Sequence, residues 1–412
     1  MERHDRWALP RLASLLVCAG VLSGCGGGGT GTPPGPAPST ATPSPSSSPG
    51  TTTIDRIVTQ NYPEAFGVEL AIYAGGVLKY AHGYGLRDRG LPDIFPTMPN
   101  FWRTQPVDQA LNLPRGVFAP DQSTVFELAS VSKEFTAAAI LLLQQDGKLS
   151  TSDLLSKYFP TFPNASSISL LQLIEHSSGL VDYNNFGTSP DFSAAYDAFL
   201  QNGQTDYQPL LDRLAQFPLQ FAPGSAYSYS NSNYLLLAII VTKVSGMPFG
   251  TFLQQRIFQP LGMTQTQQGY PSSAVTDFAL GYGDVGAGPR RGWQSNLQWL
   301  AGPGGLTSTV GDLEKWDRAV RQPGMLFGAQ ALNAMFAPGP YPQSYGTYAA
   351  GWFVSTLEGR LYIWHDGAFE GFQTMNATFP SDGIEIIILT NDGTGLDPYY
   401  IVPQLYDIAK TL

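Results

Sequence analysis

A serine and a lysine that could carry out nucleophilic chemistry stand three positions apart in the segment Glu127-Leu-Ala-Ser130-Val-Ser-Lys133. The Ala- and Leu-rich run over 132–146 predicts a helix that ends at Gly147. This spacing places Ser130 and Lys133 on one helix face, about one turn apart. Lys133 can then accept the hydroxyl proton, provided that its amine is neutral or its charge is offset. The simpler alternative is a serine that caps the helix beside an exposed lysine.

A second polar segment, Tyr227-Ser-Tyr229-Ser-Asn231, directly precedes an apolar run over 232–245 that predicts another helix. A tyrosine hydroxyl beside a cationic lysine can shift toward phenolate and act as a base. The amide of Asn231 can hold a substrate carbonyl. The alternative is an aromatic turn in which the asparagine only caps the following helix.

A third segment is Trp364-His365-Asp366-Gly367-Ala368, where we expect His365 to end a strand. Gly367 allows a ligand to approach the backbone closely. The backbone amide of Ala368 can stabilise an oxyanion at the strand edge. The alternative is a strand that ends in a glycine turn with a surface histidine.

Regular elements must bring these three segments together. Two β-rich runs over 67–73 and 77–84 flank Gly75-Gly76, which predicts a hairpin. A Pro-rich stretch over 91–119 is typical of an inserted surface loop. A helix-rich middle part follows, and the C-terminal part returns to strands before a last helix. Besides the two helices above, we predict helices over 54–62, 169–176, 209–216, 248–259 and 397–410, and strands over 348–357, 360–365, 372–379 and 384–389.

This order predicts a mixed α/β fold of the α+β type. An antiparallel sheet is built from both ends of the chain and flanked by helices, and an all-α lobe is inserted between its halves.

The three segments occur in the order and at the intervals of one enzyme superfamily. The chain resembles the serine β-lactamases and penicillin-binding proteins, in the branch of class C β-lactamases, D,D-peptidases and esterases. Further motifs support the resemblance, which covers about residues 54 to 412. They are Leu173-Ile-Glu-His176-Ser-Ser-Gly179-Leu180, Pro260-Leu-Gly-Met263 and Gly304-Gly-Leu-Thr-Ser308-Thr-Val-Gly-Asp312-Leu.

The resemblance implies roles for the matching residues. Ser130 is the implied nucleophile, Lys133 its activating partner, and Tyr229 the general base that later protonates the leaving group. Asn231, His365 and Gly367 are implied in substrate binding. The amides of Ser130 and Ala368 are the implied oxyanion hole. No cofactor is implied, and His176 is interpreted as a buried, hydrogen-bonding residue of the fold.

The His365-Asp366-Gly367 segment departs from the Lys-Thr-Gly of class C β-lactamases. A histidine is neutral or only partly charged near pH 7, so it holds a substrate carboxylate less firmly than lysine does. An Asp366 carboxylate that faces the cleft would repel such a substrate. The sequence therefore favours an esterase or broad acyl hydrolase, followed by a D,D-peptidase or D-aminopeptidase. A β-lactamase and a non-catalytic envelope-binding protein are the remaining alternatives.

The N-terminus predicts export. Arginines precede an apolar run over 12–22, which is shorter than the ~20 residues of a membrane-spanning helix. We interpret 1–24 as a lipoprotein signal peptide, because Leu22-Ser23-Gly24-Cys25 resembles a lipobox. Residues 25–53 are then a lipidated cysteine and a Gly/Pro/Ser/Thr-rich linker. The predicted location is the bacterial cell envelope, on the periplasmic side, with the membrane as partner through the lipid.

Composition excludes several classes of function. The formal net charge is −10, whereas a nucleic-acid-binding protein shows a basic surface. Cys18 and Cys25 are the two cysteines, and the four histidines lie far apart without an HExxH pattern, so the sequence indicates no metal site. No Gly-x-Ser-x-Gly elbow occurs, which argues against an α/β-hydrolase. The expected substrate is a small ester, a peptide or a peptidoglycan-derived molecule.

Overall fold

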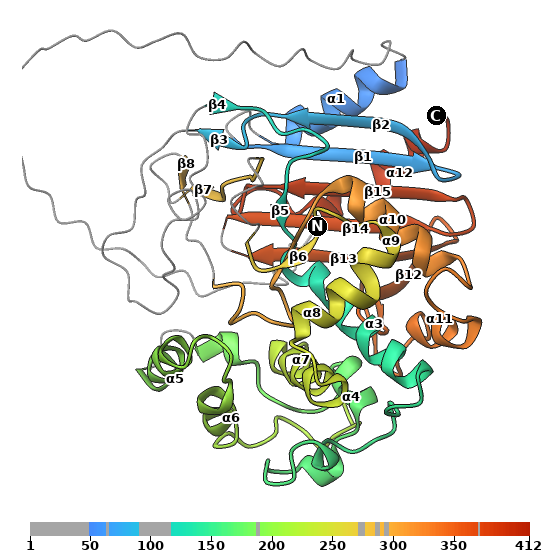
Figure 1. Cartoon of the computed structure of the whole chain (residues 1–412). Helices are drawn as coiled ribbons and strands as arrows, with labels where there is room; N and C mark the ends of the chain where they lie inside the picture. Colours follow the sequence, from blue (N-terminus) through green and yellow to red (C-terminus); the bar gives the residue numbers. More distant parts are fainter. Residues whose placement is uncertain are drawn as a thin grey trace, which may run out of the picture. The chain divides into compact units, whose positions relative to one another are not determined.

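The computed structural model describes residues 49–62, 66–89, 117–186, 190–270, 277–284, 289–291, 296–369 and 371–412. Its central sheet has eight antiparallel strands in the order β10-β11-β12-β13-β14-β15-β1-β2 (Figure 1). The predicted antiparallel sheet is thus confirmed, since β1 near the start of the domain pairs with β15 near its end. The bounds are β1 Val68–Ala74, β2 Val77–Tyr84, β10 Pro342–Gln343, β11 Gly346–Tyr348, β12 Phe353–Leu357, β13 Arg360–Phe369, β14 Phe372–Phe379 and β15 Ile384–Thr390.

The predicted hairpin is confirmed as β1 and β2. Gly75 and Gly76 form its turn with φ values of 61° and 75°, a region that glycine enters without the steric cost of a Cβ atom. The strand predicted over 348–357 is instead two strands, because residues 349–352 form a turn between β11 and β12.

The prediction that His365 ends its strand is wrong. β13 continues to Phe369 and pairs with β14 along its whole second half, from His365 opposite Asn376 to Phe369 opposite Phe372. Asp and Gly are depleted in strands, but pairing with β14 overrides this local preference at Asp366 and Gly367. The third chemical segment therefore lies inside a strand.

Helices cover both faces of the sheet. On one face lie α3 (Ser132–Gln145) and α10 (Val310–Arg321), since Glu134 receives a hydrogen bond from Asn376 of β14 and Arg321 forms an ion pair with Glu385 of β15. On the other face, Tyr406 of α12 (Val402–Ala409) stacks on Phe379 at 3.8 Å between ring centroids. α1 (Pro49–Asn61) and the turn η7 (Pro398–Tyr400) lie beside α12.

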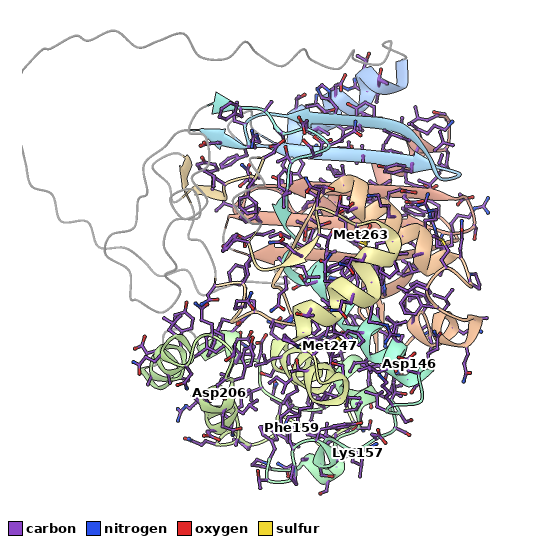
Figure 2. All side chains as sticks on the ribbon, viewed as in Figure 1. Asp146, Lys157, Phe159, Asp206, Met247 and Met263 are labelled. Atoms are coloured by element: carbon purple, nitrogen blue, oxygen red, sulfur yellow. The ribbon has the colours of Figure 1, made fainter. Side chains whose placement is uncertain are left out.

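The inserted lobe is helical, as predicted. It contains α4 (Leu170–Ile174), α5 (Pro190–Gln201), α6 (Gln208–Leu214) and α7 (Asn231–Ser245). The helix predicted over 248–259 is divided into α8 (Phe249–Leu253), a π-helical turn (Gln254–Phe258) and α9 (Gln259–Leu261). Asp146 follows the last turn of α3 (Figure 2). It forms a 2.8 Å ion pair with Arg256 of the π-helical turn.

Several elements were not predicted, namely α5, α10 and α11 (Ala329–Met335). The described residues also form two small two-stranded sheets, β3 (Asp88–Arg89) with β4 (Val117–Phe118) and β7 (Tyr282–Asp284) with β8 (Pro289–Arg291). A third small sheet has β9 (Leu306–Ser308) between β5 (Phe126–Glu127) and β6 (Gln267–Gln268).

The N-terminal predictions lie mostly outside the described residues, including the signal peptide, Cys25 and most of the linker. α1 begins at Pro49, within the predicted linker, rather than at Ile54. Most of the loop predicted over 91–119 is also outside the described part. Among the described helices, none alone is long and apolar enough to cross a membrane; α7 and Phe249–Leu261 reach that length and composition only as a pair bent by 73°.

Candidate active site

Ser130 lies in a short 3-10 turn, η2 (Ala129–Val131), that runs directly into α3. Ala129 has a φ of 47°, a conformation that costs free energy for a residue with a side chain. A Cβ atom on Gly367 of β13 would lie 2.3 Å from the Leu128 carbonyl oxygen and 3.1 Å from the Ser130 nitrogen. Gly367 therefore allows β13 to run beside the amide of Ser130, and a larger residue would push the strand away.

Lys133 is fully buried, with an exposed fraction of 0%. Its Nζ donates hydrogen bonds to Ser130 Oγ at 3.0 Å, to Asn231 Oδ1 at 2.8 Å and to the Pro303 carbonyl oxygen at 2.8 Å. The charged form has three N–H donors, and these three acceptors use all of them. Ser130 itself is only half-buried, so the group that Lys133 contacts is accessible from outside.

Asp182 orients Asn231. Its Oδ2 accepts a hydrogen bond from Asn231 Nδ2 at 2.8 Å. A carboxylate only accepts hydrogen bonds, so the amide must turn its Nδ2 to Asp182 and its Oδ1 to Lys133. Sequence reasoning missed Asp182, although it stands two residues after the His176–Leu180 motif. The contact depends on a helix 49 positions further along the chain.

The pKa of Lys133 is lowered to about 7 by burial, although the negative charges of Asp182 and Asp366 act in the opposite direction. The neutral amine has two N–H donors and one lone pair. Asn231 Oδ1 and the Pro303 carbonyl can only accept, so they take the two donors. The lone pair must then face Ser130, which is the orientation that proton transfer from the hydroxyl requires.

Tyr229 lies against the same lysine, with Lys133 Nζ 4.7 Å from its ring centroid. Part of the residue is exposed, whereas its hydroxyl oxygen is buried. Burial raises the pKa of Tyr229 well above its ordinary value, and a hydrogen bond with Ser130 lowers it only in part. The expected shift toward phenolate is therefore wrong, because desolvation raises the pKa of Tyr229 and so favours its neutral form. Tyr229 remains a proton donor.

His176 is confirmed as a buried, hydrogen-bonding residue. Its Nδ1 accepts from the Ser230 backbone amide at 3.1 Å. Its ring lies 4.3 Å from that of Tyr229 and 4.6 Å from that of Tyr348, between centroids. Burial lowers the pKa of His176 well below its ordinary value, so the ring is neutral. It packs against the ring of Tyr229.

His365 is also buried, with an exposed fraction of 0%. Its Nε2 is 3.0 Å from the Tyr348 hydroxyl and its Nδ1 is 2.5 Å from the Asp366 carbonyl oxygen. Burial, together with the charge of Lys133, lowers its pKa to about 3. A neutral imidazole cannot pair with a substrate carboxylate, so the structure places His365 in the wall of the site rather than in charge recognition.

Asp366 belongs to the electrostatics of the same site. Its side chain is 5% exposed, and its charge acts on Lys133 and Tyr229. An ionised Asp366 would place a negative charge close enough to act on Lys133 and Tyr229. Ala368, two positions on, is exposed on β13.

The structure thus brings together Ser130, Lys133, Tyr229, Asn231 and Gly367 from segments that are far apart in the sequence. Cys25 lies outside the described residues. Among the described residues, no group of three or more His, Cys, Asp or Glu side chains is arranged to hold a metal ion.

Comparison with protein families matches residues 54–404 to the family model described as Beta-lactamase. The chain belongs to the beta-lactamase family. Its curated relatives include Penicillin-binding protein 4* of Bacillus subtilis, 30% identical over 288 residues, or 65% of this chain and 61% of the relative. A D-aminopeptidase of Gluconobacter oxydans is 28% identical over 275 residues, or 65% of this chain and 50% of the relative. The chain thus matches about half to three-fifths of these relatives' length.

Solved structures share the fold of this beta-lactamase-family chain. D-amino acid amidase from Ochrobactrum anthropi, complexed with D-phenylalanine, superposes with a TM-score of 0.67 at 23% identity, covering 88% of this chain and 99% of the amidase. A D-stereospecific amidohydrolase from Streptomyces gives a TM-score of 0.65 at 21% identity, covering 85% and 98%. These neighbours confirm the predicted α+β architecture with an antiparallel sheet.

Proposed function

We propose that this chain is a serine hydrolase that forms an acyl-enzyme on Ser130. The observation that carries the proposal is Lys133, a buried amine whose pKa is near 7 and whose lone pair, in the neutral form, faces the Ser130 hydroxyl. A residue kept only for structure gains nothing from such a shift, because burying an amine costs free energy. Perturbed groups of this kind cluster at functional sites.

In the first step Ser130 Oγ attacks the substrate carbonyl carbon while Lys133 accepts the hydroxyl proton. The carbonyl oxygen becomes an oxyanion beside the amides of Ser130 and Ala368. The intermediate then collapses, the bond to the leaving group breaks, and Tyr229 gives its proton to that group. The ammonium of Lys133 returns a proton to Tyr229. Water repeats the sequence on the acyl-enzyme and releases the acid.

Asp366 supports a preference for substrates without a carboxylate near the reacting bond. Its charge acts on Lys133 and Tyr229 inside a largely desolvated site, and like charges repel more strongly there than in water. Neutral His365 offers no compensating positive charge. We therefore favour short neutral esters over penicillins and over peptides that end in D-Ala-D-Ala.

A second candidate class is amides of D-amino acids with a free amino group. The relatives include a D-aminopeptidase, and the fold is that of a D-amino acid amidase. An ammonium group on the substrate would find the Asp366 carboxylate attractive rather than repulsive. The same residue therefore discriminates between the two candidates.

The test compares p-nitrophenyl butyrate, D-alanine p-nitroanilide and nitrocefin on the wild type, Asp366→Asn and Asp366→Thr. We expect nitrocefin to be the poorest substrate and Asp366→Thr to improve it relative to the ester. If Asp366→Asn keeps its ester hydrolysis but loses most of its anilide hydrolysis, the result would favour amides of D-amino acids with a free amino group as substrates. Wild-type hydrolysis of nitrocefin at least as fast as that of the ester would contradict the charge argument, as would equal losses on all three substrates.

We further propose that the chain is exported and held at a membrane of the cell envelope by a lipid on Cys25. The support is the apolar run that ends at this cysteine and the charge-free linker that follows it. Cys25→Ser should release the protein into the soluble periplasmic fraction. A variant that stays with the membranes would contradict the lipobox interpretation.

A further inference from the structure

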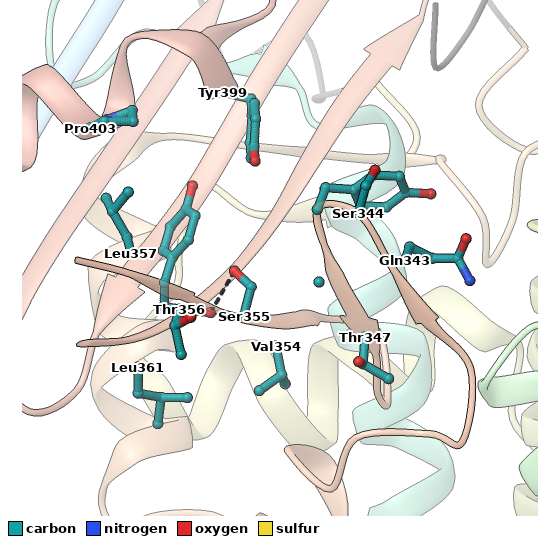
Figure 3. A pocket seen from close by; sticks show the side chains of 13 residues that line it. Gln343, Ser344, Thr347, Val354, Ser355, Thr356, Leu357, Leu361, Tyr399 and Pro403 are labelled. Carbon is teal, nitrogen blue, oxygen red and sulfur yellow. Dashed lines mark hydrogen bonds between the residues drawn. The ribbon is translucent and has the colours of Figure 1, made fainter. Parts of the chain in front are cut away.

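An open cavity of about 440 Å³ lies away from Ser130, at the β10 end of the sheet (Figure 3). It is formed by the β10–β11 hairpin, by β12 and the start of β13, and by η7 and the beginning of α12. Its volume falls in the range of small-molecule sites, about 300–1,000 Å³. The lining residues are Gln343, Ser344, Tyr345, Gly346, Thr347, Val354, Ser355, Thr356, Leu357, Leu361, Tyr362, Tyr399 and Pro403.

The chemical character of this lining is uniform. None of its residues is acidic or basic, although 13% of the chain is charged. Three tyrosines, five further polar side chains of Ser, Thr and Gln, and the apolar Val354, Leu357, Leu361 and Pro403 make up the lining together with Gly346. A charged ligand would find no counter-charge here, and a purely apolar ligand would leave the hydroxyls without partners after displacing their water. The lining fits a neutral ligand that has both apolar faces and hydroxyl groups.

The aromatic walls are held in place by packing. The Tyr399 ring lies 4.7 Å from that of Trp364, and the Tyr345 ring lies 5.1 Å from that of Phe353, between centroids. Figure 3 shows Tyr399 reaching from η7 toward the strand that carries Ser355. Rings fixed in this way lose little conformational freedom when a ligand binds, which favours affinity.

We propose that this cavity is a binding site for a neutral saccharide. The apolar C–H faces of a sugar ring would pack on Tyr399 and Tyr345, and its hydroxyls would exchange hydrogen bonds with Ser355 and Gln343. The site is distinct from the catalytic groups and would not take part in bond breaking. The proposal therefore goes beyond the acyl-hydrolase function and does not depend on it.

The cavity adjoins the wall of the active site. Tyr345 lines the cavity and lies close enough to Tyr227 to raise its pKa. Tyr227 in turn packs against His176, at 6.0 Å between ring centroids, and His176 supports Tyr229. A series of aromatic contacts therefore connects the cavity with Tyr229.

The test measures binding of two neutral trisaccharides, chitotriose and maltotriose, to the full chain carrying Ser130→Ala, by isothermal titration. This variant lacks the nucleophile, so the result is independent of whether the acyl-enzyme mechanism is correct. We expect at least one sugar to bind with a dissociation constant of about 1 mM or lower. Absence of binding by both sugars would overturn the proposal.

Two substitutions locate the site. Tyr399→Ala removes one aromatic wall, and Ser344→Trp fills the cavity from an exposed turn that carries no core contact. Ser381→Trp is the matched control, because it adds the same side chain to an exposed turn outside the lining. We expect each of the first two to weaken binding at least tenfold and the control to leave it unchanged. If Tyr399→Ala unfolds, Ser344→Trp decides alone; sugar binding unchanged by Ser344→Trp would overturn the proposal.

Discussion

Lys133 and Glu134 are neighbours on α3, both fully buried, and each belongs to a polar cluster of a different kind. Burial lowers the pKa of Lys133 to about 7 and raises that of Glu134 well above its ordinary value. Both shifts favour the neutral form, as desolvation requires. What differs is the neighbourhood: the lysine contacts the half-buried hydroxyl of Ser130, whereas the glutamate contacts only buried groups.

The cluster around Glu134 is closed. Its Oε2 accepts from Trp316 Nε1 at 2.8 Å and from Asn376 Nδ2 at 3.1 Å, and Asn376 Nδ2 also donates to Asp317 Oδ1 at 2.8 Å. All four residues are fully buried, so no substrate reaches them. A perturbed pKa alone therefore does not mark an active site in this protein. What distinguishes the candidate active site is a group with a shifted pKa that contacts the half-buried hydroxyl of Ser130.

Removing the amine of Lys133 should give the largest effect, which should be a loss of activity. Lys133→Met keeps the length and removes the amine, so ester hydrolysis should fall by about 10³–10⁴-fold, the upper part of the range for general acid–base groups. Two effects on stability oppose each other, because a desolvated amine is removed while the Asn231 and Pro303 oxygens lose their donor. In the wild type, the unfolded state keeps the Lys133 proton up to about pH 10.5, whereas the folded state releases it near pH 7. Between these pH values the unfolded state binds more protons, so the unfolding free energy falls as the pH drops from 10.5 to 7.

Steady-state kinetics and thermal unfolding at several pH values check this prediction. Lys133→Arg is a useful control, since it keeps a charge but cannot supply a neutral amine. A loss of less than tenfold in Lys133→Met would show that another group accepts the Ser130 proton.

Tyr229→Phe should give the next effect, and its size should depend on the leaving group. A raised pKa makes Tyr229 a proton donor, and a basic amine leaving group needs a proton far more than p-nitrophenolate does. We expect at least a 10²-fold loss on an amide or an unactivated ester and a smaller loss on p-nitrophenyl butyrate. Equal losses on both substrates would argue for a role in positioning Ser130 rather than in proton donation.

Glu134→Ala should instead act on stability. It leaves the Trp316 donor without its acceptor, removes one of the two acceptors of Asn376 Nδ2 and opens a cavity, which together cost about 2–4 kcal/mol of unfolding free energy. The folded fraction should keep its kcat/KM within about threefold, whereas Glu134→Gln should cost less stability than alanine. Denaturant unfolding and active-site titration separate the two quantities. A Glu134→Ala variant that stays stable but loses activity would show that the Glu134 cluster also serves catalysis, which would contradict the contrast with Lys133.

Asp182→Asn should give the smallest effect in free energy, a loss of about tenfold in kcat/KM. The pH dependence of kcat/KM should change as well. The Asp182 charge raises the pKa of Lys133, so its removal lowers that pKa further. Activity needs the neutral amine, and the acid limb of the kcat/KM profile should therefore move from near pH 7 to lower pH. The amide oxygen introduced by this substitution can still accept from Asn231, which keeps the geometry. An acid limb that stays in place would show that Asp182 does not act through Lys133.

Much of this arrangement could be predicted from sequence. Two β-rich runs and the Gly75-Gly76 turn predicted the first hairpin, and the resemblance to the serine β-lactamase superfamily implied that Ser130, Lys133, Tyr229 and Asn231 act together. Local preference misled at Asp366-Gly367, where pairing with β14 extends the strand. The helix α10 was also missed, although Thr309 caps it by accepting from the Asp312 amide.

Long-range geometry accounts for what the sequence could not predict in the site. Asp182 acquires its role only through contact with Asn231, and nothing next to it in the sequence indicates this. The proton-donor state of Tyr229 likewise depends on how deeply its hydroxyl is buried by segments distant in the chain. A motif specifies residue types, whereas desolvation depends on the complete fold.

The most direct test of the central claim is covalent labelling of the full chain with a fluorophosphonate, followed by peptide mass spectrometry. The account predicts one modified serine, Ser130, with a labelling rate that rises with pH around 7 as Lys133 loses its proton. A folded Ser130→Ala variant should take up no label. Equal labelling of this variant and the wild type, or modification of another serine, would contradict the assignment of Ser130 as the nucleophile.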